Sequence, residues 1–140
     1  MDLSRSVVNK MLKNDAFSKW LGIELIEIKE GHCKLQMKVR KEMTNGFYIA
    51  HGGISYSLAD SCLAFASNSY GIQSVSLETS ISHTKKVESE DILIATSKEI
   101  NKTTKTALYY ITITNQNEEE IAHFKGTVYR TGKKWFSKKV

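Results

Sequence analysis

The sequence predicts an α+β domain in which an antiparallel sheet packs against one long central helix. A largely apolar run, residues 54–66, stands between two groups of segments in which apolar and polar residues alternate. The turns between neighbouring strand segments are short, and short connections favour antiparallel pairing. The apolar run is also the only segment with enough apolar surface to cover one face of such a sheet.

The first 22 residues have the pattern of helices. Apolar side chains recur at steps of three and four residues over 3–20, which predicts one helix or two short helices broken near Asn14 and Asp15. Gly22 is suited to end this segment, because glycine readily adopts the left-handed backbone of a C-cap.

Two strands are predicted before the central helix. In residues 23–30, Ile23, Ile26 and Ile28 alternate with charged residues. Residues 33–40 alternate in the same way, and Gly31 marks a turn between the two segments. This pattern is typical of a hairpin with one solvated face.

Four strands are predicted after the helix, at 74–84, 91–100, 106–115 and 120–130. The turns between them, at 87–91, 101–104 and 115–117, carry polar and asparagine residues that favour turns. No proline interrupts these segments. The basic tail, residues 133–140, is expected to be disordered.

Length and composition indicate a single globular domain over residues 1–140. The net charge of +5 fits either a lysine-rich solvated surface or affinity for a polyanion such as a phosphorylated ligand. No apolar run approaches the roughly 20 residues of a membrane span. No nucleic-acid-binding signature is present, and residues 1–15 are too charged for a signal peptide. We therefore expect a cytoplasmic protein that binds neither membrane nor nucleic acid.

The two cysteines do not indicate a metal site or a disulfide framework. Cys33 and Cys62 are separated by a spacing that matches no metal-binding motif. Cys62 lies inside the apolar run, where a buried free thiol is the usual environment. No metal is therefore expected.

Asp60 interrupts the apolar run. It lies among Leu58, Ala59 and Leu63, and burying an unpaired carboxylate is costly. In one interpretation Asp60 belongs to a narrow polar edge of the helix, which it shares with Tyr56. In the other it is a partly desolvated base or nucleophile with a raised pKa.

His51, Gly52 and Gly53 precede the run and form the predicted helix start. Backbone N–H groups at this position are unpaired and lie at the positive end of the helix dipole. They are suited to bind an anion or a developing oxyanion. The alternative is a flexible glycine turn, with His51 as a cap or a packed ring.

The spacing of Gly52 and Asp60 bears on assembly. Eight residues of helix separate them by about 12 Å at about 1.5 Å per residue. A reacting carbonyl needs a donor and a base each within roughly 3 Å, so one copy of the helix cannot supply both. Two copies packed antiparallel about a twofold axis can. If these residues act together, the enzyme is an obligate homodimer with shared active sites.

One motif joins the loop to the helix: Asn45-Gly46, then His51-Gly52-Gly53, then Leu58-Ala59-Asp60. With SNSYG at 67–71 and AHFKGTVYRTG at 122–132, it resembles the signature of the phenylacetate-degradation (PaaI-type) acyl-CoA thioesterases. The element order resembles the hotdog fold of that family, a curved antiparallel sheet wrapped around one long helix. The likeness covers roughly residues 15–132.

The resemblance implies hydrolysis of an acyl-CoA thioester to a free acid and coenzyme A, with no cofactor beyond the substrate itself. The N–H of Gly52 would polarise the carbonyl, and Asp60 of the neighbouring chain would activate water or attack directly. The amide of Asn45 would orient the water or the nucleophile, and His51 would hold the loop.

The resemblance also implies a helper hydroxyl at Ser76, for which Ser74 is an alternative. Relatives often carry Arg-Pro-Gly where this chain has Thr84-Lys85-Lys86-Val87. In this chain, Lys85 and Lys86 either bind the coenzyme A phosphates as point charges or form a solvated pair. The expected substrate-binding residues are Gly53, Phe47, Tyr48, Tyr56, Lys85 and Lys86.

Several features of the function stay open. The aromatic lining suits aryl and medium-chain acyl groups alike, and phenylacetyl or hydroxyphenylacetyl esters follow from the resemblance alone. A hotdog dehydratase would need a second acid–base residue, and the central helix offers neither Glu nor a second His. A non-catalytic acyl-CoA-binding module would not depend on Asp60. The assembly expected of the thioesterase is a homodimer that pairs into a homotetramer.

Overall fold

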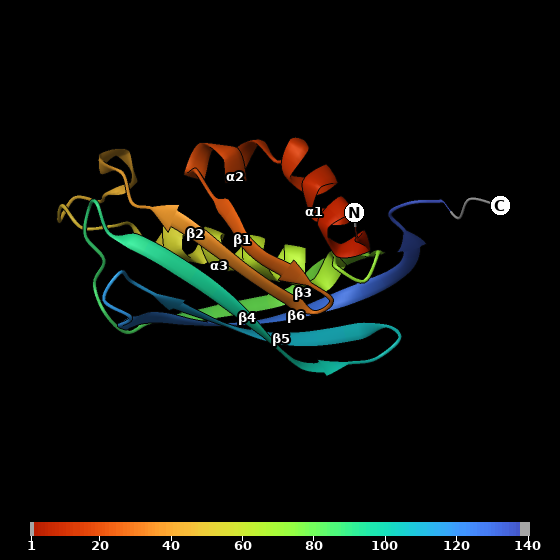
Figure 1. Cartoon of the computed structure of the whole chain (residues 1–140). Coiled ribbons are helices and arrows are strands. Elements are labelled where there is room, and N and C mark those ends of the chain that lie inside the picture. Colours follow the sequence, from red (N-terminus) through yellow and green to blue (C-terminus); the bar gives the residue numbers. More distant parts are fainter. Residues whose placement is uncertain (1, 138–140) are drawn as a thin grey trace.

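The computed structural model describes residues 2–137, and its elements follow the predicted order. Two short helices come first, then a hairpin, the long helix and four strands (Figure 1). The elements are α1 (Leu3–Lys13), α2 (Ala16–Leu21), β1 (Glu24–Lys29), β2 (His32–Lys38), the one-turn 3-10 helix η1 (Lys41–Met43), α3 (Gly52–Asn68), β3 (Ile72–His83), β4 (Ile92–Lys102), β5 (Thr106–Thr114) and β6 (Glu120–Lys134).

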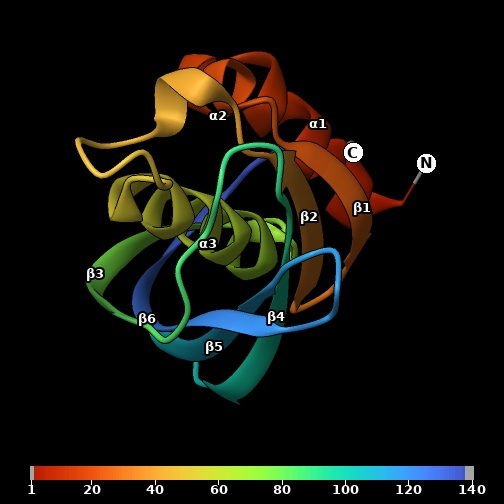
Figure 2. The same cartoon turned by 90° about the vertical axis from the view of Figure 1, so that its left-hand side faces the viewer.

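The six strands form one antiparallel sheet in the order β1-β2-β4-β5-β6-β3. Figure 1 shows the sheet curving under α3, and Figure 2 looks toward the start of α3 with the strands wrapped around it. Helices α1 and α2 cover the side of α3 that the sheet leaves open. The predicted hotdog arrangement, an α+β fold with one central helix, is confirmed.

The N-terminal segment forms two helices because a second N-cap interrupts it. The side chain of Asp15 accepts the N–H of Ser18 at 2.9 Å, which starts α2 immediately after α1 ends. Gly22 then ends α2 with φ +75°, as predicted. The hydroxyl of Ser18 lies 2.9 Å from that of Ser61, so α2 rests on the middle of α3.

The predicted alternation is correct for β2 and partly wrong for β1. Ile26 is exposed, whereas Leu25 and Ile28 pack against the core. A β-bulge between Leu25 and Glu27 shifts the register and exchanges the two faces of the strand. In β2 and just beyond it, the predicted inward residues are all fully buried: Cys33, Leu35, Met37 and Val39.

The prediction that β3 and β4 pair through a short turn is wrong. β3 lies at the edge of the sheet and pairs only with β6, so residues 84–91 form a crossover between distant strands. Polar turn residues indicate that a strand ends, but they do not determine which strand is its neighbour. The crossover passes the start of α3, where Ala50 N–H donates to Val87 O at 2.7 Å (Figure 2).

The C-terminal segment is structured further than predicted. β6 continues to Lys134, opposite Ile72 of β3. Trp135 donates its backbone N–H to Gly71 O at 2.9 Å and its indole N–H to Asn68 Oδ1 at 2.8 Å. The expectation of a disordered tail is therefore wrong for residues 133–135, where pairing and one aromatic anchor outweigh the charge of the segment. Residues 138–140 of the predicted tail lie outside the described residues.

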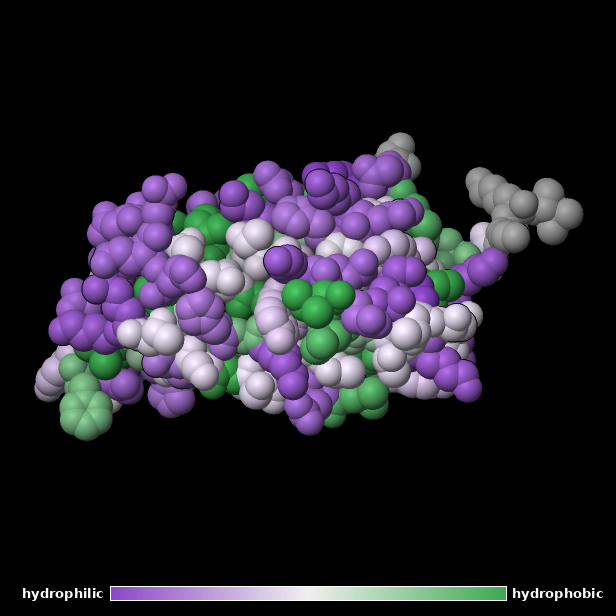
Figure 3. Space-filling model, turned by 90° about the horizontal axis from the view of Figure 1, so that it is seen from below, coloured by the Kyte–Doolittle hydropathy of each residue, from purple (hydrophilic) through white to green (hydrophobic). Residues whose placement is uncertain are grey.

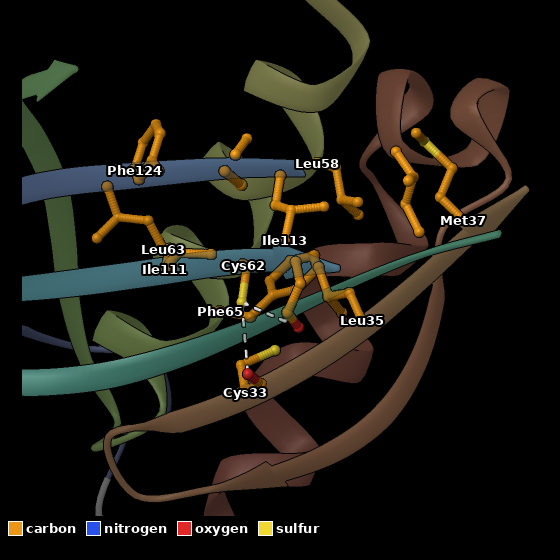
Figure 4. Close-up of a cluster of buried hydrophobic side chains, with 14 of the residues drawn as sticks. Cys33, Leu35, Met37, Leu58, Cys62, Leu63, Phe65, Ile111, Ile113 and Phe124 are labelled. Atoms are coloured by element: carbon orange, nitrogen blue, oxygen red, sulfur yellow. Dashed lines mark hydrogen bonds between the residues drawn. The ribbon is translucent and has the colours of Figure 1, made fainter. Parts of the chain in front are cut away.

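The core lies between α3 and the sheet. Figure 4 shows Leu58, Cys62, Leu63 and Phe65 of α3 against side chains of β2, β5 and β6, and all four are at most 1% exposed. The thiol of Cys62 donates to Cys33 O at 3.4 Å, and burial raises the pKa of that thiol well above its usual value. Both cysteines are free and buried, as predicted for Cys62.

The close packing of Leu63 against Gly126 fixes the position of α3 on the sheet. A Cβ at Gly126 would lie 2.5 Å from Leu63 Cδ2. We expect Leu63→Ala to lower the free energy of unfolding by about 3 kcal/mol and Gly126→Ala to lower it by about 1–2 kcal/mol through overpacking. Because the two changes compensate in volume, the double variant should lose less than the sum, which denaturant unfolding measures as a coupling energy.

Gly46→Ala is the control for that cycle, because a Cβ there would meet no atom within 4 Å. It should change the free energy of unfolding by less than about 0.5 kcal/mol. Strictly additive effects of the Leu63 and Gly126 changes on the free energy of unfolding would show that the packing of Leu63 does not depend on the glycine.

The outer surface of the sheet is mostly hydrophilic. Figure 3 shows this face with small hydrophobic areas separated by hydrophilic ones, and Tyr110 and Tyr129 are among the exposed apolar residues of β5 and β6. Within residues 2–137, no helix has the length and apolar character needed to span a bilayer.

Candidate active site

Helix α3 begins at a histidine cap. Nδ1 of His51 accepts the N–H of Gly53 at 2.9 Å, so this amide is already engaged. The N–H of Gly52, the first helical residue, has no acceptor among residues 2–137. The first turn is thus a capped helix start and not a flexible turn. It presents the free amide of Gly52 at the positive end of the helix dipole.

A second histidine, His83, packs against this start. Its Nε2 lies 3.2 Å from Gly52 O, and a Cβ at Gly52 would come within 3.1 Å of its Cε1. A side chain at this position would make a tight contact, which the ring could relieve by moving a few tenths of an ångström. His83 belongs to the end of β3, 31 residues further along the chain. His83 could not be predicted as a site residue, because nothing in the local sequence distinguishes it from a surface histidine.

Gly52 lines a hollow of about 410 Å³, which we call the amide hollow. It brings together four of the predicted residues, Asn45, Gly52, Lys85 and Lys86. Its full lining is Asn45, Ile49, Ala50, Gly52, Ser55, His83, Thr84, Lys85, Lys86 and Val87. Oδ1 of Asn45 accepts the N–H of Phe47 at 2.9 Å, and no acceptor for its amide hydrogens occurs among residues 2–137.

The crossover contributes two cations to the amide hollow. Nζ of Lys85 lies 3.1 Å from Glu119 Oε2, and Nζ of Lys86 lies 3.5 Å from Glu88 Oε1. Both pairs are solvent-exposed and therefore weak, so the ammonium groups can exchange them for a more highly charged anion. With the helix dipole they make this hollow an electropositive site suited to phosphate or a developing oxyanion.

Asp60 lies in a different hollow, the carboxylate hollow, of about 260 Å³. Its lining is Asp60, Leu63, Ala64, Ser67, Ser74, Val75, Ser76 and Val128. The side chain of Asp60 is exposed in the single chain, yet enough protein surrounds it that partial desolvation raises the pKa of the carboxyl group above its usual value. No hydrogen-bond donor or cation pairs with this carboxylate within residues 2–137.

Ser74 and Ser76 both line the carboxylate hollow, but their hydroxyls differ. Ser74 Oγ donates to backbone oxygens of Ser67 and Ile72, and its backbone is held by Asn68. The hydroxyl of Ser76 has no partner among residues 2–137. Ser76 is therefore the serine with a hydroxyl free to meet a water beside Asp60.

The predicted aromatic residues lie outside both hollows. Phe47 and Tyr48, at the tip of the loop before α3, are 83% and 88% exposed. Tyr56 packs edge-on against Phe124 with ring centroids 5.4 Å apart, and its hydroxyl is hydrogen-bonded to Thr79. In the single chain, none of these rings therefore lines either hollow.

The two hollows share no residue. One chain holds the free amide at the start of α3, beside the cations of the crossover, and it holds the carboxylate two turns later on the same helix, beside the free hydroxyl of Ser76 on β3. Residues 47–122 match the family model of the thioesterase superfamily, which is more than half of the chain. The chain belongs to the thioesterase superfamily. The predicted family, and with it a thioester hydrolase of the hotdog fold, is confirmed.

Several named proteins and solved structures align with most of this chain. The acyl-coenzyme A thioesterase PaaI of Escherichia coli is 37% identical over 122 residues, which cover 87% of each protein. The solved structure of the E. coli PaaI protein superposes with a TM-score of 0.90 at 34% identity, covering 95% of this chain and 99% of that one. A protein of Archaeoglobus fulgidus, named only provisionally as an esterase, is 42% identical over 89% of this chain and 80% of its own length.

Two of the similar solved structures contain a ligand, acetyl-CoA in one and coenzyme A in the other. The smu.793 protein of Streptococcus mutans, solved with bound acetyl-CoA, superposes with a TM-score of 0.77 at 28% identity, covering 80% of this chain and 90% of that one.

Proposed function

We propose that this protein hydrolyses acyl-CoA thioesters to a free acid and coenzyme A in active sites shared between two copies of the chain. The observation that carries the proposal is the division of the reactive groups between two hollows. Gly52, with its free amide, lines one, and Asp60, with its carboxylate, lines the other. The amide hollow therefore lacks the carboxylate, and the carboxylate hollow lacks the amide.

The chemistry follows from these two groups. The thioester carbonyl oxygen accepts the free N–H of Gly52, which stabilises the negative charge that develops there when the carbonyl carbon is attacked. As general base, Asp60 of the second copy takes a proton from water as the water oxygen bonds to that carbon. Collapse of the tetrahedral intermediate breaks the carbon–sulfur bond and releases coenzyme A as a thiolate, which then takes up a proton. As nucleophile, Asp60 would instead form an anhydride that water cleaves in a second step.

Asn45 and Ser76 have supporting roles in this scheme. Asn45 lies in the amide hollow, and its amide hydrogens would orient the water or the carboxylate that approaches from the second copy. The unpaired hydroxyl of Ser76 would hold the water next to Asp60. His51 keeps the helix start rigid by capping it.

The edge strand supports a dimer about a twofold axis. β3 ends the sheet and carries exposed Val75 and Leu77, and an uncovered sheet edge readily pairs with another chain. Pairing of two β3 strands would place two α3 helices antiparallel, with Gly52 of each facing Asp60 of the other. Phe47 and Tyr48 would then reach the second copy and line its acyl site. A homotetramer stays a prediction.

The electropositive character of the amide hollow suits the coenzyme A part of the substrate. Lys85 and Lys86 could meet its phosphates as point charges. Structures of a S. mutans relative with acetyl-CoA and a S. pneumoniae relative with coenzyme A support this ligand. The E. coli relative named PaaI supports an aryl or medium-chain acyl group, including phenylacetyl and hydroxyphenylacetyl. A panel of coenzyme A esters, followed by thiol release, identifies which of them is cleaved.

Mixed dimers test the shared site. We expect homodimers of Asp60→Asn and of Gly52→Pro to be nearly inactive, because each lacks one of the two groups in both sites. A heterodimer of the two variants contains one site with an intact Gly52 and an intact Asp60. Purified heterodimer should therefore show about half of the wild-type kcat, and a random mixture about a quarter.

The assay is thiol release, with the dimer checked by sedimentation. Heterodimers of wild-type and Asp60→Asn chains serve as the calibration, since they also hold one intact site. A well-folded heterodimer of the two inactive variants that recovers no activity would contradict a site shared between chains.

A further inference from the structure

His83 holds one side of the peptide that follows Gly52. Its Nε2 lies 3.2 Å from the carbonyl oxygen of Gly52, and its ring packs so close to the glycine that a Cβ would come within 3.1 Å. The ring also lines the amide hollow. It is thus in direct contact with the residue whose N–H would bind the oxyanion.

His51 holds the other side of the same peptide. The N–H of Gly53 donates to Nδ1 of His51 at 2.9 Å. The Gly52–Gly53 peptide is therefore fixed at its oxygen by one histidine and at its hydrogen by another. Glycine has little conformational preference of its own, so the backbone angles of Gly52 and the direction of its N–H depend on such external contacts.

The two contacts also define which ring nitrogen carries hydrogen. A carbonyl oxygen can only accept, so Nε2 of His83 must carry a hydrogen to bond to Gly52 O. An amide N–H can only donate, so Nδ1 of His51 must be bare when it accepts from Gly53. The two contacts therefore require a hydrogen on Nε2 of His83 and none on Nδ1 of His51.

We propose that His83 is a positioning residue for the reaction: by donating from Nε2 to Gly52 O and packing on the Gly52 backbone, it fixes the direction of the Gly52 N–H toward the thioester oxygen. The role rests on the proposed function, because it acts on the amide assigned there. It is distinct from ligand binding, since His83 acts through the backbone of Gly52.

Two substitutions separate the hydrogen bond from the packing. His83→Phe keeps a ring against Gly52 and removes the donor, whereas His83→Gln keeps an N–H donor and removes the ring. We expect His83→Phe to lower kcat about tenfold with KM changed less than about twofold, since small errors of alignment cost rate. His83→Gln should stay within about threefold of the wild type. The control is His123→Phe, an exposed histidine on the outer face of β6.

Nuclear magnetic resonance gives a readout that does not depend on turnover. Long-range ¹H–¹⁵N spectra of the wild type should show His83 and His51 with hydrogen on Nε2. In His83→Phe, the amide signal of Gly52 should shift and the hydrogen exchange of the Gly53 amide, which donates to His51, should become faster, with the melting temperature close to that of the wild type.

Three results would overturn the proposal. These are a His83 ring with hydrogen on Nδ1 only, an unchanged kcat in His83→Phe, and equal losses in both His83 variants that follow a fall in melting temperature. If the wild type itself releases no thiol from any acyl-CoA, the proposed function fails. The ring hydrogen and the Gly52 amide signal then still decide whether His83 positions this peptide.

Discussion

Replacing Asp60 with asparagine should lower kcat by about 10³-fold. Asparagine has nearly the same size and lies in the same carboxylate hollow, but it can neither take a proton from water nor attack the carbonyl. The amide hollow, with Gly52 and the two lysines, is unchanged, so coenzyme A should still bind. Thiol release measures the turnover, titration calorimetry measures coenzyme A binding, and sedimentation checks the dimer.

Stability measurements distinguish this loss from unfolding. Desolvation raises the pKa of Asp60 in the folded chain, which means that the ionised carboxylate disfavours folding at pH values above its unfolded pKa. Asparagine removes that cost, so Asp60→Asn should melt at the same temperature as the wild type or higher. Glu90→Gln, which removes an exposed carboxylate on the far side of the crossover, is the control and should change neither turnover nor binding.

The pH dependence of the wild type has a definite direction. The base form of Asp60 is lost as the pH falls through its raised pKa, so kcat/KM should decline at a higher pH than an ordinary aspartate would cause. This limb should be absent from the residual activity of Asp60→Asn. Full turnover in the asparagine form would remove Asp60 from the chemistry, and binding of acyl-CoA without any turnover in the wild type would favour the binding module.

The parts of the molecule that could be predicted from sequence are those that depend on neighbouring residues. The alternation in β2, the glycine that ends α2 and the apolar character of α3 are local patterns, and each determines its element directly. The motif from Asn45 to Asp60 is also local, because it lies in one loop and the helix that follows. For that reason Asn45, Gly52 and Asp60 could be selected before the fold was known.

The remaining features depend on contacts between distant residues. The edge position of β3 depends on its pairing with β6, and the position of Trp135, just after β6, depends on Gly71 and Asn68. His83 meets Gly52 only because the crossover and the helix start come together at one end of the sheet. The bulge in β1 shifts the register by one residue, so that Leu25 faces the core and Ile26 faces solvent. The alternation of residues in the sequence does not reveal this shift. No spacing in the sequence encodes any of these contacts.

The amide of Gly52 can be tested by removing one hydrogen. Gly52→Pro should lower kcat by about 10²–10³-fold, the usual cost of losing an oxyanion donor. Proline at this position removes the N–H and adds a Cβ beside the ring of His83. Residue 52 is the first residue of α3, where the N–H makes no helical hydrogen bond. Proline is tolerated at such a position, because it loses no helical bond there and its fixed φ suits the helix. His51 already has the extended backbone, φ −64° and ψ 133°, that a following proline requires.

Gly52→Ala is the matched control, because it adds the same Cβ beside His83 but keeps the N–H. The contact of 3.1 Å should shift the ring slightly and lower kcat by no more than about threefold, so the ratio of the two variants isolates the amide. Thiol release under saturating substrate gives both values. Equal activity of the proline and alanine variants would mean that the oxyanion is stabilised elsewhere, and the start of α3 would then serve only to bind the coenzyme A phosphates.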